Sequence, residues 1–179
     1  MCGVQERGTV ATLTAQPAVE SDRRRPPPGS GRRLAVAAGV AAAVVLVDQL
    51  TKRWAVDRLS RGPVHIIWTL DLELTRNTGS AFSLFQGDAA VLVVVAVLLI
   101  GGLAVLVRRS ASTGRAAVLG LIIGGALGNL SDRLFRGDHG AVVDFVDFHW
   151  WPTFNVADAS IVVGCVLLGA SLLWAGGDR

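Results

Sequence analysis

The sequence predicts an all-α integral membrane protein, a bundle of four transmembrane helices with a small external β-sheet on the outer membrane surface. Three observations predict this class. Hydrophobic residues make up 51% of the 179 residues, and charged residues only 17%. The apolar residues are clustered in long uncharged runs, unlike the periodic spacing of a soluble amphipathic helix. Between two of the runs, a short segment alternates apolar and polar residues, which is typical of a half-buried strand.

Four apolar runs are candidates for membrane spans. Residues 89–107 and 159–177 each contain 19 residues without a charge, close to the ~20 that a hydrocarbon core requires. Residues 34–47 and 116–131 form shorter runs of 14 and 16 residues, which span the membrane only if their polar ends enter the interface. We therefore predict a four-span domain at residues 34–175.

Basic residues predict the orientation of the spans. Residues 1–33 are rich in polar residues, proline and arginine, a composition that cannot bury a core and predicts a flexible basic tail. Arginine clusters beside a first span normally stay in the cytoplasm. Both termini, including residues 176–179, are then cytoplasmic, and segments at about 53–88 and 132–158 are external. The expected location is the cytoplasmic membrane, with the first span retained as a helix.

The overall charge is compatible with two kinds of partner. The net charge is +3 and the pI is about 9.6. However, the basic residues adjoin apolar runs and have no stacking aromatics between them, so membrane lipid is the expected partner and nucleic acid is not. Cys2 and Cys165 lie in the tail and within the fourth span, so a disulfide between them is not expected.

Local patterns predict a strand and a close helix contact. Residues 70–75 read LDLELT, an alternation expected of a strand, and residues 77–79 follow with turn chemistry. A small sheet on the outer leaflet, with its apolar face toward lipid or substrate, fits this segment better than an independent soluble domain. In the third span, Gly120, Gly124 and Gly128 recur every four residues, which favours close helix packing.

Polar residues at the ends of two spans form pairs. Asp48 and Lys52 are four residues apart and share a face of a continuing helix, so they can form an ion pair. Asn129 and Arg133 repeat this spacing at the end of the third span, with Asp132 adjacent. Ionisable groups at membrane depth are costly and usually face a bundle interior or a wet cavity. A structural pair and a functional site both remain open for these residues.

Asp144 and Asp158 form the sharper candidate pair. Asp144 has apolar neighbours, and Asp158 opens the fourth span, so both are expected at the outer interface. Two carboxylates that share a site do not both ionise readily, so one keeps a proton while the other activates a water, as in aspartic peptidases. The alternative for Asp158 is structural, because Asn155 and Asp158 have the spacing of a helix cap followed by an acid in the first turn. The two roles are compatible.

Other chemistries have less support. No HExxH motif is present, and the three histidines lack zinc-ligand spacing, although His149 with Asp144 and Asp147 leaves a metal site as a minor alternative. No GxSxG motif is present, and the serines within the spans lack a partner histidine, which argues against a serine peptidase. The aromatic residues between 145 and 154 are most simply an interfacial belt, with substrate contact as the alternative.

Five segments together resemble the lipoprotein signal peptidases, also called signal peptidase II. They occur in the family's order, with spacings that agree with four spans, and the resemblance covers about residues 34–175, leaving out the amino-terminal 33. Each segment by itself is weak evidence, but the five in sequence are highly specific. The segments are DQLTK at 48–52, NTGSAF at 77–82, GGALGNLSDR at 124–133, VVDF at 142–145 and FNVAD at 154–158.

The resemblance implies an activity and a set of site residues. Asp144 and Asp158 would be the catalytic pair of an aspartic peptidase that cuts prolipoproteins just before a diacylglyceryl-modified cysteine. The external sheet would cradle the substrate, and no metal or organic cofactor is needed. The residues that would bind substrate or support the site are Asp48, Lys52, Asn77, Gly79, Asn129, Arg133 and Asn155.

Two functions from other classes are kept as rivals. In a small transporter or channel subunit, intramembrane charges would mark an ion path, but here the carboxylates cluster at one interface. A noncatalytic lipid-binding or assembly protein would not require both aspartates. We expect a membrane-embedded peptidase that acts as a monomer.

Overall fold

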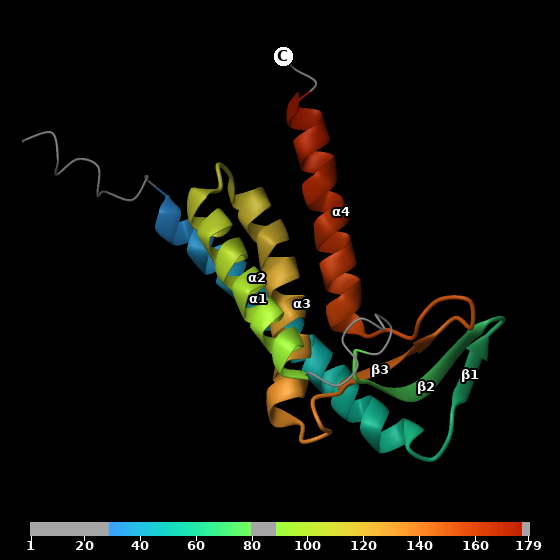
Figure 1. The fold of residues 1–179 in the computed structure, drawn as a ribbon. Helices are drawn as coiled ribbons and strands as arrows, with labels where there is room; N and C mark the ends of the chain where they lie inside the picture. The colour runs from blue at the N-terminus through green and yellow to red at the C-terminus, as the bar shows by residue number, and fades with distance from the viewer. Residues whose placement is uncertain (1–28, 80–88, 177–179) are drawn as a thin grey trace, which may run out of the picture.

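The computed structural model describes residues 29–79 and 89–176, which form four helices and three strands (Figure 1). All four helices are long and apolar enough to cross a membrane, which confirms the prediction of four spans beside a small sheet. Most of the basic tail, the end of the NTGSAF segment and the last three residues lie outside the described residues. The elements are α1 (Ser30–Leu59), β1 (Val64–Ile67), β2 (Leu70–Asn77), α2 (Ala89–Arg109), α3 (Thr113–Phe135), β3 (Val142–Asp147) and α4 (Val156–Gly176).

Helix α1 is longer than the apolar run that predicted it. It begins after Gly29, whose φ of 84° is left-handed, and continues past Val47 to Leu59. Its 30 residues rise about 45 Å, more than the ~30 Å of a hydrocarbon core. Its last turns therefore reach the sheet, where Ala55 and Leu59 pack with Phe145. Both Asp48 and Lys52 lie on this continuous helix, as their shared face required.

Helix α3 is the centre of the bundle because its glycines let two helices approach closely. A Cβ added at Gly120 would lie 2.6 Å from the Ala37 carbonyl oxygen of α1, and one at Gly124 would lie 2.8 Å from Val44 Cβ. On another side of α3, a Cβ at Gly125 would meet Ser160 Oγ of α4 at 2.5 Å. The predicted close packing of the third span is confirmed.

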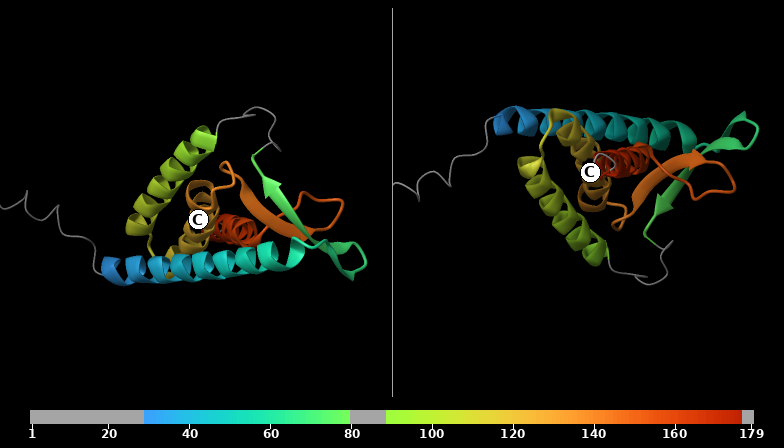
Figure 2. Two further views of the ribbon diagram at one scale, coloured as in Figure 1. Left: turned by 90° about the horizontal axis from the view of Figure 1, so that it is seen from below. Right: turned by 90° about the horizontal axis from the view of Figure 1, so that it is seen from above.

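Helices α1 and α2 diverge. They lie near each other where α1 starts and α2 ends, and α2 then leans away from α1 toward its own start (Figure 2). At the near end, Arg33 Nη1 donates a hydrogen bond to the Ser110 carbonyl just after α2. The gap between α1 and α2 is thus closed at the end remote from the sheet and wider toward the sheet.

The sheet is antiparallel, in the order β1-β2-β3. Strand β2 confirms the alternating segment, and Leu72 of β2 lies opposite Val146 of β3 on a face that packs against the end of α1. Strand β3 was not predicted as a strand. Its first four residues, Val142–Phe145, are all buried, so both of its faces are covered and the period-two signal is lost.

Candidate active site

Asp144 lies on β3 with its side chain 1% exposed. Its Oδ1 accepts a hydrogen bond from Asn155 Nδ2 at 2.6 Å, and its Oδ2 accepts one from Asn77 Nδ2 at 3.1 Å. Burial, and then the nearby charge of Asp158, raise the pKa of Asp144 to about 6. The carboxyl group of Asp144 can therefore hold a proton at a pH where most aspartates have lost theirs.

Asp158 lies in the first turn of α4 and forms a reciprocal cap with Asn155. The backbone N–H of Asp158 donates to Asn155 Oδ1 at 2.9 Å, and the backbone N–H of Asn155 donates to Asp158 Oδ2 at 3.2 Å. The cap predicted from the spacing is therefore present. Because the first turn of a helix favours negative charge, this position also stabilises an ionised carboxylate.

Two asparagines connect the two aspartates. Asn155 Nδ2 contacts Asp144 Oδ1 and lies 3.1 Å from Asn129 Oδ1. Asn129 Nδ2 in turn donates to Asp158 Oδ1 at 2.7 Å. The structure thus brings α3, β3 and α4 together at one point, and the expected convergence of Asp144 and Asp158 is visible in Asn155, which contacts both.

A buried ionic network lies next to this pair. Lys52 is fully buried, and its Nζ is 2.9 Å from Asp48 Oδ2 and 3.0 Å from Asp132 Oδ2. The same Nζ donates to Asn129 Oδ1 at 2.9 Å, so the lysine fixes the amide that contacts Asp158. Asp48 Oδ1 accepts the backbone N–H of Ala157 at 3.0 Å, which ties α1 to the start of α4. A buried charge with fewer partners would be strongly destabilising.

Asn77 and Gly79 hold the end of β2 beside Asp144. The backbone N–H of Gly79 donates to Asn77 Oδ1 at 2.8 Å, which orients the Asn77 amide group toward the aspartate. Gly79 has a φ of 88°, and a Cβ there would lie 2.5 Å from Leu92 Cδ1 of α2. A side chain at Gly79 would therefore be strained in its backbone and would collide with α2.

Arg133 is half-buried near both aspartates. Its charge interacts with Asp158 and Asp144, and its Nη1 is 3.5 Å from the Asn129 carbonyl oxygen. Within the described part of the chain, its buried Nε has no hydrogen-bond partner. The guanidinium thus has a donor left over at the site.

Three residues of the network were not ranked as site residues from the sequence. Asp132 binds Lys52, and its Oδ2 also accepts the backbone N–H of Val143 at 3.1 Å, beside Asp144. Gln49 Nε2 and Arg136 Nη2 contact Asp132 Oδ1 at 3.0 and 2.8 Å. The four-residue spacing of Asp132 and Arg136 was the available signal, because it places both on one face of α3.

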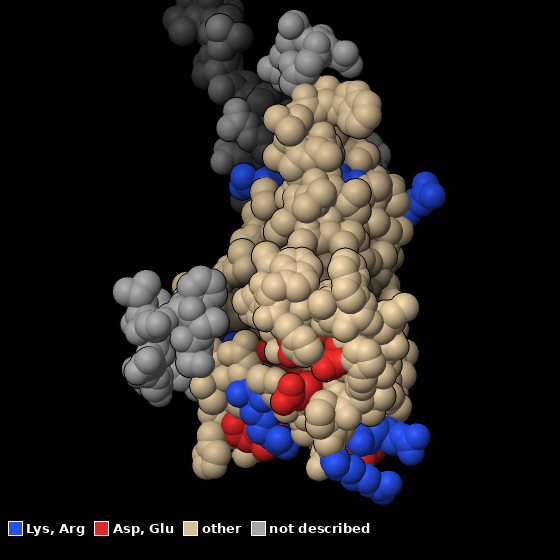
Figure 3. All heavy atoms as spheres, turned by 90° about the vertical axis from the view of Figure 1, so that its right-hand side faces the viewer, with Lys and Arg blue, Asp and Glu red and all other residues tan. Residues whose placement is uncertain are grey.

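An aromatic groove adjoins Asp158. A cavity of about 460 Å³ is lined by Asp158, by α4 residues and by four aromatic residues of the preceding loop, Phe148, Trp150, Trp151 and Phe154. Trp150 and Trp151 remain 72% and 58% exposed. Figure 3 shows acidic side chains in a hollow below the broad uncharged surface of the spans. This groove offers an apolar surface directly beside the carboxylates.

The minor alternative of a metal site has no support in the geometry. His149 Nε2 is 3.1 Å from Asp71 Oδ2 and 3.7 Å from Asp147 Oδ2. Among residues 29–79 and 89–176, no group of three or more His, Cys, Asp or Glu side chains could hold a metal ion. The histidine instead joins the aromatic loop to β2 through Asp71.

Comparisons with known proteins agree with this architecture. A family model described as signal peptidase (SPase) II matches residues 40–174. The chain is 47% identical over 148 residues to a lipoprotein signal peptidase of Mycolicibacterium smegmatis, an alignment that covers 80% of this chain and 63% of that protein. It is 46% identical over 142 residues to one of Mycobacterium avium, covering 76% of this chain and 78% of the relative.

Solved structures show the same fold. A bacterial membrane enzyme determined by the in meso method superposes with a TM-score of 0.71 at 26% identity, covering 81% of this chain and 92% of that one. A second such structure gives a TM-score of 0.69, also at 26% identity, over 78% of this chain and 93% of that chain.

Proposed function

Because this chain belongs to the signal peptidase II family, we propose that it is an aspartic endopeptidase that removes signal peptides from diacylglyceryl-modified prolipoproteins. The observation that carries the proposal is the pair Asp144 and Asp158, which are linked through the side chains of Asn129 and Asn155. The substrate class rests on the family, and the chemistry rests on this pair.

The two carboxyl groups have different environments, which suits different roles. Asp158, at the start of α4 with N–H donors from Asn129 and Asn155, is the proposed base. Asp144, whose pKa is raised to about 6 by burial and by the Asp158 charge, is the proposed acid. Acid–base catalysis by an aspartate pair requires one protonated and one ionised carboxyl group.

The proposed reaction follows from these roles. Asp158 takes a proton from a water whose oxygen forms a bond to the carbonyl carbon before the lipidated cysteine. Asp144 gives its proton to the carbonyl oxygen, producing a tetrahedral diol. When the C–N bond breaks, the proton held by Asp158 passes to the leaving amine, and Asp144 recovers its proton from the diol. Atoms and charge balance, and both aspartates return to their starting states.

The surrounding residues have supporting roles in this proposal. Asn77, Asn129 and Asn155 hold the carboxylates, and Gly79 shapes the end of β2 beside them. The Arg133 Nε is a donor for a substrate carbonyl. Asp48 and Lys52 act at a distance, by fixing Asn129 and the start of α4. The Asp158 groove and its aromatic loop accommodate the substrate's apolar segment.

The geometry also supports the proposed placement in the membrane. The acyl chains of a lipidated cysteine keep its peptide bond near the interface, and Asp144 and Asp158 lie where the sheet meets the spans. We place the sheet outside and both termini in the cytoplasm, with the chain acting as a monomer, since all the proposed site residues come from one chain. Among the described residues, the buried charges gather at this one end, which disfavours an ion path.

The test is cleavage of a lipidated prolipoprotein in membranes that contain Asp144→Asn or Asp158→Asn. Loss of a positioned acid or base is expected to slow cleavage about 10²- to 10⁴-fold. The matched control is Asp138→Asn, which removes a partly exposed carboxylate paired with Arg76 Nε at 3.0 Å. If either site variant, folded and at normal abundance, cleaves at the parent rate, the aspartate pair is not catalytic.

A further inference from the structure

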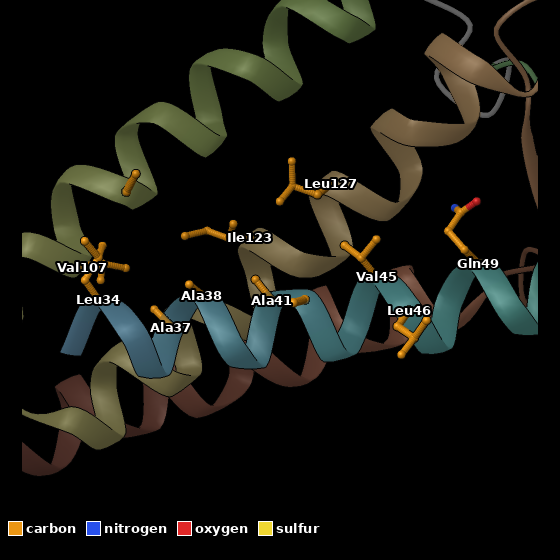
Figure 4. A pocket seen from close by; sticks show the side chains of 12 residues that line it. Leu34, Ala37, Ala38, Ala41, Val45, Leu46, Gln49, Val107, Ile123 and Leu127 are labelled. Carbon is orange, nitrogen blue, oxygen red and sulfur yellow. The ribbon is translucent and has the colours of Figure 1, made fainter. Parts of the chain in front are cut away.

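A second cavity lies between α1, α2 and α3, away from the aspartates (Figure 4). Its volume is about 630 Å³, and among the described lining residues Gln49 is the one polar side chain. On α1 half of the lining residues are alanines, and α2 contributes Ala104 and Val107 near its end. Figure 4 shows α2 rising away from α1 beyond Val107, so the divergence of the two helices creates the groove.

The closed end of the groove lies beside arginines. The lining begins at Leu34 and Val107, which directly follow Arg32 and Arg33 on α1 and directly precede Arg108 and Arg109 on α2. The hydrogen bond from Arg33 to the Ser110 carbonyl holds these two helix ends together. Arg32, Arg108 and Arg109 are exposed at this end, remote from the sheet. An apolar groove therefore opens under a group of positive charges.

From this combination, we propose that the groove holds one acyl chain of an anionic phospholipid whose phosphate binds the arginines at the helix ends. Basic groups between spans are typical sites for anionic headgroups. The groove itself suits an acyl chain because Leu34 and Leu46, on its rim, are 45% and 60% exposed and leave it open to the surrounding lipid. The alternative occupant, a transmembrane helix of another protein, would fill an apolar groove without needing the arginines at its end.

The dimensions agree with this occupant. The lining on α1 extends from Leu34 to Gln49, about 22 Å along the helix axis at 1.5 Å per residue. One leaflet contributes about 15 Å to the hydrocarbon core. A chain that enters beside the arginines can thus lie in the groove over the full depth of its leaflet.

The far end of the groove reaches the buried ionic network. Gln49 lines the groove, and its Nε2 donates to Asp132 Oδ1 and to the Gly128 carbonyl. The end of the groove remote from the arginines is therefore closed by a residue that connects α1 to Asp132. The lipid site is separate from the groove beside Asp158, which is lined by other residues.

The experiment measures lipid binding to the purified, delipidated full chain by native mass spectrometry. The probes are phosphatidylglycerol, phosphatidylcholine with identical acyl chains, and glycerol 3-phosphate. We expect one tightly bound phosphatidylglycerol, weaker phosphatidylcholine and no retained glycerol 3-phosphate. Since each arginine near an anionic lipid contributes about a fivefold change in affinity, Arg32→Gln with Arg108→Gln should weaken phosphatidylglycerol binding about 30-fold.

A second variant tests the groove itself. Ala38→Phe with Ala42→Phe fills it at exposed lining positions. Exclusion of even two methylene groups from an apolar site should weaken binding of both lipids by about tenfold. The matched controls are Ala43→Phe, exposed on α1 outside the groove, and Arg58→Gln with Arg61→Gln near the sheet. Thermal unfolding in detergent verifies that each variant is folded.

Four results would overturn the proposal. The first is equal affinity of the parent protein for the two lipids, and the second is parent affinity in the folded groove-filling variant. The third is an equal effect of the two arginine pairs. Glycerol 3-phosphate binding as tightly as the whole lipid would likewise exclude a role for the acyl chain.

Discussion

Asp158 caps α4 and is also the proposed base, and both roles depend on its place at the start of the helix. Its carboxylate accepts the backbone N–H of Asn155 and thereby caps α4, and it also accepts Asn129 Nδ2. The structural interpretation of Asn155 and Asp158 as a cap is therefore correct without excluding the proposed base. A helix start is a suitable place for a base because the capping donors hold the carboxylate in a fixed orientation.

Asp144 predicts a pH dependence of stability. Burial and the Asp158 charge raise its pKa from 3.8 to about 6, so the folded protein favours the protonated carboxyl group. Its contribution to stability is complete below pH ~4 and is lost as the pH rises to about 6. At about 1.4 kcal/mol per pKa unit, the loss amounts to roughly 3 kcal/mol. Unfolding of the parent and Asp144→Asn in detergent across this range should show the step only in the parent.

Asp71 supplies a control of opposite sign. The hydrogen bond from His65 lowers the pKa of Asp71, so its contribution is present above the ordinary pKa of aspartate and is lost as the pH falls. The parent protein gains stability from Asp71 above this pKa, and Asp71→Asn should remove that gain. Asp144→Asn should instead remove a loss of stability. If Asp144→Asn leaves the difference from the parent constant between pH 4 and 7, the burial argument for Asp144 is wrong.

The predictability of the site residues depended on sequence distance. Asp48 and Lys52 are one helical turn apart, and their predicted ion pair is confirmed at 2.9 Å. Asp132 is equally buried, but its local spacing indicated only the contact with Arg136, because its other partners come from α1 and β3. The catalytic roles of Asp144 and Asp158 remain proposals. For them, the family resemblance contributed what spacing could not, because the cap alone explains Asp158.

At the scale of elements, α3 determines where the site forms. Its glycines bring α1 and α4 close, and Gly128 is the one that faces the ionic network. A Cβ added there would lie 2.6 Å from Asp48 Oδ2 and 3.3 Å from Ala157 Cβ. Asp48 cannot easily move, since Lys52 and the Ala157 N–H hold it. At Gly128, the close approach of the helices therefore depends on the same atoms as the ion pair of Asp48 and Lys52.

Gly128→Ala is accordingly expected to be destabilising. Overpacking of a fixed contact typically costs about 1–3 kcal/mol, and the shift of Asp48 should also disturb the start of α4. Gly102→Ala is the matched control, because it changes a helical glycine of α2 that has no described atom within 4 Å of the added Cβ. That control should be neutral or stabilising by up to ~1 kcal/mol. Equal unfolding midpoints for both variants would contradict the argument.

Among the strands and helices, the partly exposed elements were easier to predict from the sequence than the buried ones. Strand β2 was visible in the sequence because none of its residues is fully buried and residues 70–75 keep the alternation of apolar and polar side chains. Strand β3 was hidden because its start is buried on both faces. The four spans were predicted from length and composition alone, but the end of α1 was not, since residues beyond Val47 mix charged and apolar side chains and pack against the sheet through Ala55 and Leu59.

At the scale of the whole molecule, the charge distribution and the divergence of the helices define two ends. The sheet, the aspartates and the ionic network occupy the wide end. The narrow end has exposed Arg32 of α1 and exposed Arg108 and Arg109 of α2, beside the proposed lipid groove. Because arginine clusters stay in the cytoplasm, the narrow end is the predicted cytoplasmic end. A lipid at that end would be drawn from the inner leaflet, whereas the proposed peptide substrate approaches from the outer one.

This orientation predicts which positions a membrane-impermeant maleimide reaches in intact cells. In a background with Cys2→Ser and Cys165→Ser, Ser60→Cys lies at the end of α1 beside the sheet, and Ala111→Cys lies between α2 and α3. Both side chains are exposed. Ser60→Cys should be labelled from outside, whereas Ala111→Cys should be labelled only after the membrane is permeabilised. The reverse pattern would place the aspartates on the cytoplasmic side, where no lipid-anchored substrate displayed outside could reach them, and would remove the physical basis of the proposed function.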